Sequence, residues 1–129
     1  MSSDIKRKLA AIMFTDIVAW AKMMREDEAT ALTILENQET ILNPLFNQNN
    51  GNIIKKTGDG YLVEFNSSVE AVECALKIQE SIKKYNTISE NIEFHIRIGI
   101  HLGDIIIIEC SKFRVSVIHA DALVRLFAG

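Results

Sequence analysis

The chain has 129 residues, of which 48% are hydrophobic and 24% are charged, and these proportions are typical of one globular domain and exclude a disordered chain. Its net charge of −3 gives no basic field for a polyanion, so we expect no nucleic-acid partner. No apolar run approaches the roughly 20 residues of a membrane helix, and no signal peptide is evident, so we expect a cytoplasmic protein with no membrane segment in this chain.

No repeat or linker divides the sequence, so we expect a single domain over residues 1–129. Residues 9–14 are apolar on both faces, which predicts a central strand covered by helices. From Glu26 the pattern changes to helical spacing. The apolar side of this helix should carry Leu32, Leu35, Leu42 and Leu45, and its polar positions include Glu28, Glu36, Gln38 and Asn43. Pro44 should kink or end the helix.

A hairpin follows, with strands at residues 52–56 and 61–65. The turn between them contains Gly58 and Gly60, whose positive φ values should allow a tight reversal. Ser67 is predicted to cap a second helix that runs to about Asn86. Its apolar positions should be Val69, Val72, Leu76, Ile82 and Tyr85.

Residues 94–103 alternate strictly between apolar and polar side chains, which is the clearest strand signal in the chain. We predict residues 105–109 as its hairpin partner, residues 113–118 as a further short strand and residues 120–127 as a weak helix. This order is typical of an α+β fold with a ferredoxin-like antiparallel sheet and helices on one face.

The predicted topology brings two aspartates together. A right-handed crossover makes the first two strands parallel, with the third antiparallel between them, so Asp16 and Asp59 should lie at one edge of the sheet. Carboxylate oxygens are the ligands that Mg²⁺ prefers, so the pair is a candidate cation site. Each aspartate alone could equally be a cap or turn residue, and Lys55 could be a solvated strand lysine.

Three segments also carry a family resemblance. Residues 7–18, 53–65 and 96–103 resemble, in order and spacing, successive motifs of the class III adenylate and guanylate cyclase catalytic domain. The resemblance covers about residues 7–107 and implies a sheet with a βααββαβ core. The implied reaction is in-line attack of a ribose 3′-hydroxyl on the α-phosphorus of a nucleoside triphosphate, which yields a 3′,5′-cyclic nucleotide and pyrophosphate.

The resemblance implies roles for particular residues. Asp16 and Asp59 resemble the catalytic aspartates that bridge two metal ions per site, Mg²⁺ or Mn²⁺, and the Ile17 carbonyl would be a further ligand. The backbone N–H groups that would face the phosphates belong to Val18, Ala19 and Trp20.

The substrate and the partner are implied in the same way. Lys55 matches the base-selecting lysine of adenylate-type members, which favours ATP and a role in intracellular signalling. Because the family places each active site at a dimer interface, we expect a homodimer or a cyclase-domain partner.

The sequence departs from the family in two places. The turn after Ile17 lacks the usual glycine and hydroxyl, since Ala19 and Ala21 stand there. The family's transition-state Asn and Arg should follow the third motif, but no Asn occurs after Asn91.

The end of the chain allows two alignments with the Asn and Arg motif. In one alignment, Arg125 takes the place of the catalytic Arg and Asp121 that of the Asn. In the other, Ala128 takes the place of the Arg and Val124 that of the Asn. We expect the family's last strands to be missing, so residues 105–108 should offer a strand edge that is either exposed or paired with a partner. The alternative function is therefore a catalytically inactive, cyclase-like module for dimerisation or nucleotide binding.

Overall fold

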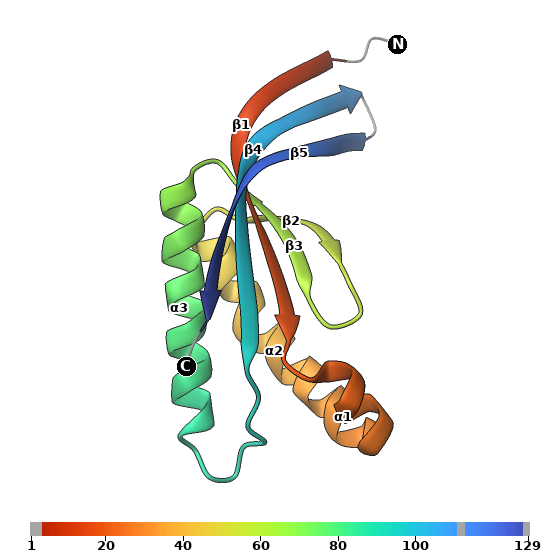
Figure 1. The fold of residues 1–129 in the computed structure, drawn as a ribbon, viewed down its shortest axis with the longest axis vertical. Coiled ribbons are helices and arrows are strands. Elements are labelled where there is room, and N and C mark those ends of the chain that lie inside the picture. The colour runs from red at the N-terminus through yellow and green to blue at the C-terminus, as the bar shows by residue number, and fades with distance from the viewer. Residues whose placement is uncertain (1–3, 111–112, 128–129) are drawn as a thin grey trace.

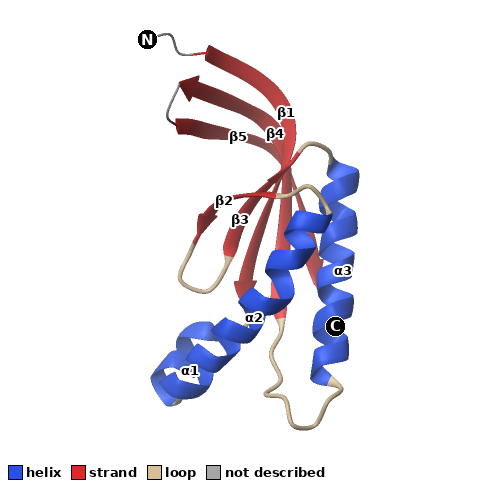
Figure 2. Cartoon of the chain, turned by 180° about the vertical axis from the view of Figure 1, so that it is seen from behind, coloured by secondary structure: helices blue, strands red, loops and turns tan. Residues whose placement is uncertain are grey.

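The computed structural model describes the backbone of residues 4–110 and 113–127 and the side chains of residues 9–103. The elements, in chain order, are β1 (Asp4–Ile17), α1 (Trp20–Glu26), α2 (Glu28–Gln48), β2 (Asn52–Lys56), β3 (Tyr61–Phe65), α3 (Ser68–Asn86), β4 (Ile96–Cys110) and β5 (Phe113–Phe127). The strands form one sheet in the order β2-β3-β1-β4-β5, with every neighbouring pair antiparallel. Helices α2 and α3 cover one face of it (Figures 1 and 2). The predicted α+β fold is confirmed.

The register of β1 places its end between two other segments. Thr15 of β1 is opposite Tyr61 of β3, and Asp16 is opposite Arg97 of β4. The β2–β3 turn and the start of β4 therefore flank the end of β1. This is the edge at which the sequence predicted that Asp16 and Asp59 meet.

The predicted apolar side of helix α2 is confirmed in part, since Leu42 is fully buried and Leu35 and Leu45 are partly buried against the core. The residues that the helix buries against the sheet are Ala31, Ile34, Gln38, Leu42 and Phe46. Leu32 is 47% exposed, whereas Gln38, expected on the polar side, is fully buried. These buried residues follow the three- and four-residue spacing of one side of a helix. Pro44 is exposed and does not end the helix, which continues to Gln48.

Helix α3 begins where its cap was predicted. The Ser67 hydroxyl oxygen accepts a hydrogen bond from the Glu70 N–H at 3.2 Å. Its buried residues are Ala71, Cys74, Ala75, Ile78 and Ile82, and the predicted Val69 and Leu76 are exposed. Burial raises the pKa of the Cys74 thiol to about 12. Among the described residues, no helix has the length and hydropathy needed to cross a membrane.

The predictions for the last third of the chain are wrong in three respects. Residues 105–108 belong to the interior of β4 rather than to a hairpin partner, and they pair with β1 on one side and β5 on the other. They are therefore no exposed strand edge. Residues 120–127 belong to β5 rather than to a helix, because pairing with β4 satisfies their backbone groups. The β5 register skips Asp121, which lies at an irregularity opposite Leu102 and Gly103.

Candidate functional site

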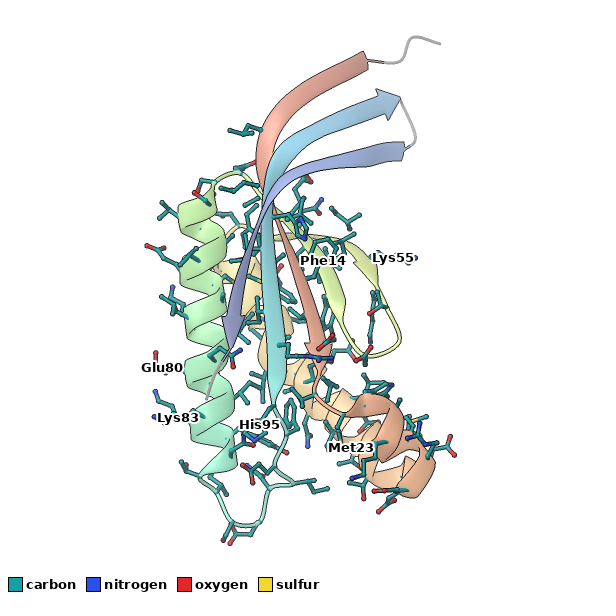
Figure 3. The ribbon with its side chains drawn as sticks, in the orientation of Figure 1. Phe14, Met23, Lys55, Glu80, Lys83 and His95 are labelled. Atoms are coloured by element: carbon teal, nitrogen blue, oxygen red, sulfur yellow. The ribbon has the colours of Figure 1, made fainter. Side chains whose placement is uncertain are left out.

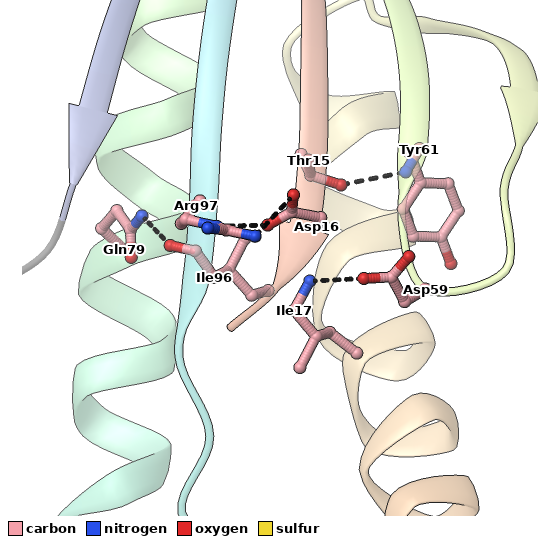
Figure 4. A network of polar contacts seen from close by, with 8 residues as sticks. All are labelled: Thr15, Asp16, Ile17, Asp59, Tyr61, Gln79, Ile96 and Arg97. Atoms are coloured by element: carbon pink, nitrogen blue, oxygen red, sulfur yellow. Dashed lines mark hydrogen bonds and ion pairs between the residues drawn. The ribbon is translucent and has the colours of Figure 1, made fainter. Parts of the chain in front are cut away.

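At the end of β1, Asp16 forms a two-pronged ion pair with Arg97. The Arg97 Nε donates to Asp16 Oδ1 at 2.8 Å and Nη2 donates to Oδ2 at 3.1 Å (Figure 4). This bonding raises the pKa of Arg97, and the nearby charge of Asp59 adds to the effect. Both side chains are about half exposed, at 53% for Arg97 and 43% for Asp16.

Arg97 is a site residue that was not predicted from the sequence, although the strand pattern contains a signal for it. Strict alternation in residues 94–103 places Arg97 on the face opposite to Ile96 and Ile98, which are buried. What the sequence alone could not supply is the register that sets Arg97 opposite Asp16. That pairing joins residues that are 81 positions apart in the chain.

The second aspartate lies in the β2–β3 turn and contacts the main chain directly after Asp16. The Ile17 N–H donates to Asp59 Oδ2 at 3.1 Å (Figure 4). The turn is closed by a Thr57 N–H bond to the Gly60 carbonyl at 2.9 Å and a Gly60 N–H bond to the Thr57 hydroxyl at 3.0 Å. The predicted meeting of Asp16 and Asp59 at one edge is thus confirmed as a placement.

The two glycines of this turn do not act as predicted, since neither has a positive φ. Gly60 is required by space instead: a Cβ there would overlap the carbonyl oxygen of Thr15, whereas a Cβ on Gly58 would meet nothing within 4 Å. Beside this close approach, the Thr15 hydroxyl oxygen accepts a hydrogen bond from the Tyr61 N–H at 3.0 Å. Gly60 therefore lets the turn dock on the backbone of β1.

The turn after β1 has a strained backbone at Ala19, the position at which the family usually has glycine. Ala19 has a left-handed backbone, with φ 60° and ψ 29°, at the start of α1. The Val18 N–H donates to the His95 carbonyl at 2.9 Å, so it would have to leave this bond to reach a phosphate. Trp20 is partly buried and packs against the core between sheet and helices.

The other predicted site residues lie apart from the two aspartates. Lys55 is exposed on the edge strand β2 and points outward from it (Figure 3). Arg125 is opposite Gly99 in the β5 register, and its side chain is outside the described part. The structure therefore brings together Asp16, Ile17 and Asp59, and leaves Lys55 at the margin of the sheet.

The two aspartates have the donor chemistry of a magnesium or manganese site. Within residues 9–103, no group of three or more His, Cys, Asp or Glu side chains is gathered as a metal cage. A Mg²⁺ ion bound with substrate commonly takes only one or two carboxylates, and water and phosphate oxygens complete its shell. Asp16 and Asp59, with the Ile17 carbonyl between them in the chain, fit that requirement.

Comparisons with known proteins agree with this geometry. A family model described as "Adenylate and Guanylate cyclase catalytic domain" matches residues 5–115. The chain belongs to this family. "Putative adenylate cyclase 3" of Rhizobium meliloti (strain 1021) is 39% identical over 112 residues, which are 85% of this chain and 19% of that protein. This chain therefore spans about a fifth of that cyclase relative.

Solved cyclase structures share the fold. The adenylate/guanylate cyclase/hydrolase from Silicibacter pomeroyi is 28% identical, with a TM-score of 0.69 over 87% of this chain and 65% of that one. A bacterial light-regulated adenylyl cyclase has a TM-score of 0.76 at 18% identity, over 92% of this chain and 38% of that one, and is evidence for the fold alone. The resemblance read from the three cyclase motifs is confirmed at the level of the family.

Proposed function

We propose that this chain is an adenylate-type cyclase domain that converts ATP to 3′,5′-cyclic AMP and pyrophosphate in intracellular signalling. The observation that carries the proposal is the bond from the Ile17 N–H to Asp59 Oδ2 at 3.1 Å, which joins the two aspartate-bearing segments of a cyclase-family fold. Lys55, at the position of the base-selecting lysine, and the name of the Rhizobium relative support ATP over GTP.

In the proposed site, Asp16, Asp59 and the Ile17 carbonyl would hold two Mg²⁺ or Mn²⁺ ions. When bound, these would supply Lewis acidity toward the ribose 3′-hydroxyl and neutralise charge on the triphosphate. The N–H groups of Ala19 and Trp20 would donate to the phosphates. Lys55 would donate to the purine edge, in a site completed by a second cyclase domain across a dimer interface.

A second candidate function is an inactive cyclase-like module that dimerises or binds nucleotide. One sequence observation favours it: no Asn follows Asn91, so neither alignment of the C-terminal segment offers the family's transition-state Asn. In the alignment on Arg125, Asp121 would place a like charge near the triphosphate. Such a chain could still contribute Asp16, Asp59 and Lys55 to a site shared with another cyclase.

Ligand binding tests the site without requiring turnover. We expect Mn²⁺ with a non-hydrolysable ATP analogue to raise the melting temperature of the protein, because a ligand that binds only the folded state stabilises it. Asp16→Ala should abolish this shift. An equal shift in the variant and the wild type would contradict the metal assignment.

Turnover separates the two candidate functions. The purified chain would be incubated with ATP and Mn²⁺ and assayed for cyclic AMP, alone and mixed with a cyclase domain that supplies the Asn and Arg. Product from the chain alone would contradict the inactive module. Product only in the mixture would assign this chain the metal-binding half of a shared site, and no product in either would contradict the cyclase proposal.

A further inference from the structure

Gln38 is a polar residue at a buried position of α2 whose neighbours on the same side of the helix are apolar. It lies on the inward side of α2, one turn from Ile34 on one side and Leu42 on the other, and all three side chains are fully buried. A buried amide is unfavourable unless its donors and acceptors are paired. The packing of α2 on the sheet alone therefore gives no reason for glutamine at this position.

The hydrogen bonding of Gln38 is confined to the aspartate turn. Its Nε2 donates to the main-chain carbonyl of Asp59 at 3.2 Å, and its Oε1 has no partner among the described residues. The buried amide therefore has one unpaired oxygen in the core, and its one hydrogen bond is to Asp59, whose carboxylate accepts from Ile17. An apolar side chain of similar shape would avoid that unpaired oxygen.

This bond acts on the orientation of the Asp59 carboxylate. The carbonyl of Asp59 belongs to the peptide that joins it to Gly60, and Gly60 is itself pressed against the Thr15 carbonyl. The Gln38 bond restrains the main chain from which the Asp59 side chain extends, and the Ile17 N–H holds the carboxylate itself through its bond to Oδ2. A metal ligand depends on such outer contacts for its aim.

We infer that Gln38 is a positioning residue that holds the Asp59 carboxylate in place for cation binding. The inference rests on the proposed role of Asp59 as a metal ligand. Gln38 reaches the site from the buried side of the turn, through the main chain, and touches no reacting atom.

The test measures Mn²⁺ alone, by the loss of the free-ion electron paramagnetic resonance signal on titration with the full chain. Gln38→Met keeps the length of the side chain and removes its donor. We expect roughly a tenfold weaker Mn²⁺ affinity, with a melting temperature equal to or above that of the wild type. If the glutamine had only a structural role, Gln38→Met would bind Mn²⁺ with the affinity of the wild type, whatever its melting temperature.

Two controls make the outcomes distinct. Ile34→Val perturbs the same side of α2 without touching the turn and should retain wild-type Mn²⁺ affinity, and Asp59→Asn should lose binding. If Asp59→Asn loses Mn²⁺ binding while Gln38→Met retains it, only the positioning role of Gln38 is overturned. The same conclusion follows if Ile34→Val weakens Mn²⁺ binding as much as Gln38→Met does. If the wild type binds no Mn²⁺, or Asp59→Asn binds as well as the wild type, the metal assignment itself fails. Gln38→Leu is a second apolar variant, for use if Gln38→Met does not fold. If neither Gln38→Met nor Gln38→Leu folds, the inference is also overturned.

Discussion

The two aspartates are held in opposite ways. The Asp59 turn is docked from inside, by the buried Gln38 amide and by the contact of Gly60 with the backbone of β1. Asp16 is held by one ion pair between half-exposed side chains, and the strained Ala19 follows it three residues later. We conclude that the interior of the fold determines the place of Asp59, whereas a surface contact determines the orientation of Asp16.

The largest effect should come from the docked turn. Gly60→Ala would drive a methyl group into the Thr15 carbonyl, so we expect a loss of about 3 kcal/mol in the free energy of unfolding, measured by urea denaturation. Gly58→Ala is the matched control and should lie within about 0.5 kcal/mol of the wild type. Equal midpoints for the two variants would contradict the proposed docking.

Loss of the Thr15 hydroxyl should weaken the same contact less. Thr15→Val keeps the shape of the side chain but leaves the buried Tyr61 N–H without its acceptor, which should cost about 1–3 kcal/mol. The control is Thr40→Val, which removes an exposed hydroxyl bonded within α2 and should change stability by less than about 0.5 kcal/mol. Thermal melts of the two variants that coincide would speak against a special role for Thr15.

On the side of Asp16, removing strain should increase stability. Ala19→Gly should add about 1 kcal/mol to the free energy of unfolding, because glycine adopts a left-handed backbone without the Cβ penalty. Ala21→Gly, in the regular part of α1, should instead lower it by about 0.5 kcal/mol. Denaturation of both variants gives the comparison, and a loss of stability in Ala19→Gly would refute the assigned strain.

The smallest effect on stability should follow removal of Arg97. Since its ion pair with Asp16 is about half exposed, Arg97→Met should leave the melting temperature almost unchanged. Its affinity for Mn²⁺ alone should rise, because a positive charge no longer competes for the Asp16 carboxylate. Lys84→Met removes the same charge from an exposed pair with Glu80 and should leave Mn²⁺ affinity as it is. Weaker Mn²⁺ binding by Arg97→Met would instead indicate that Arg97 helps to form the site.

Local patterns were sufficient for most of the fold before the last strands. The hairpin strands and the Ser67 cap follow from signals within a few residues, and the structure reproduces them. The helical surfaces were less predictable. Leucine spacing correctly predicted that Leu42 is buried, but it also predicted Leu32 on the buried side, where the structure has Ala31 instead. Burial depends on the surface that packs against the helix, which the spacing alone does not describe.

What the sequence determined by itself is the family, the order of the central strands and the edge at which Asp16 and Asp59 meet, because ordered motifs and crossover handedness are properties of the chain. Tertiary structure alone decided the pairing of residues 105–108 on both sides, the ion pair of Arg97 and the burial of Gln38. Each of these three features depends on strand register or on the packing of segments that are far apart in the chain. Such long-range pairing cannot be read from the residues near any one of them.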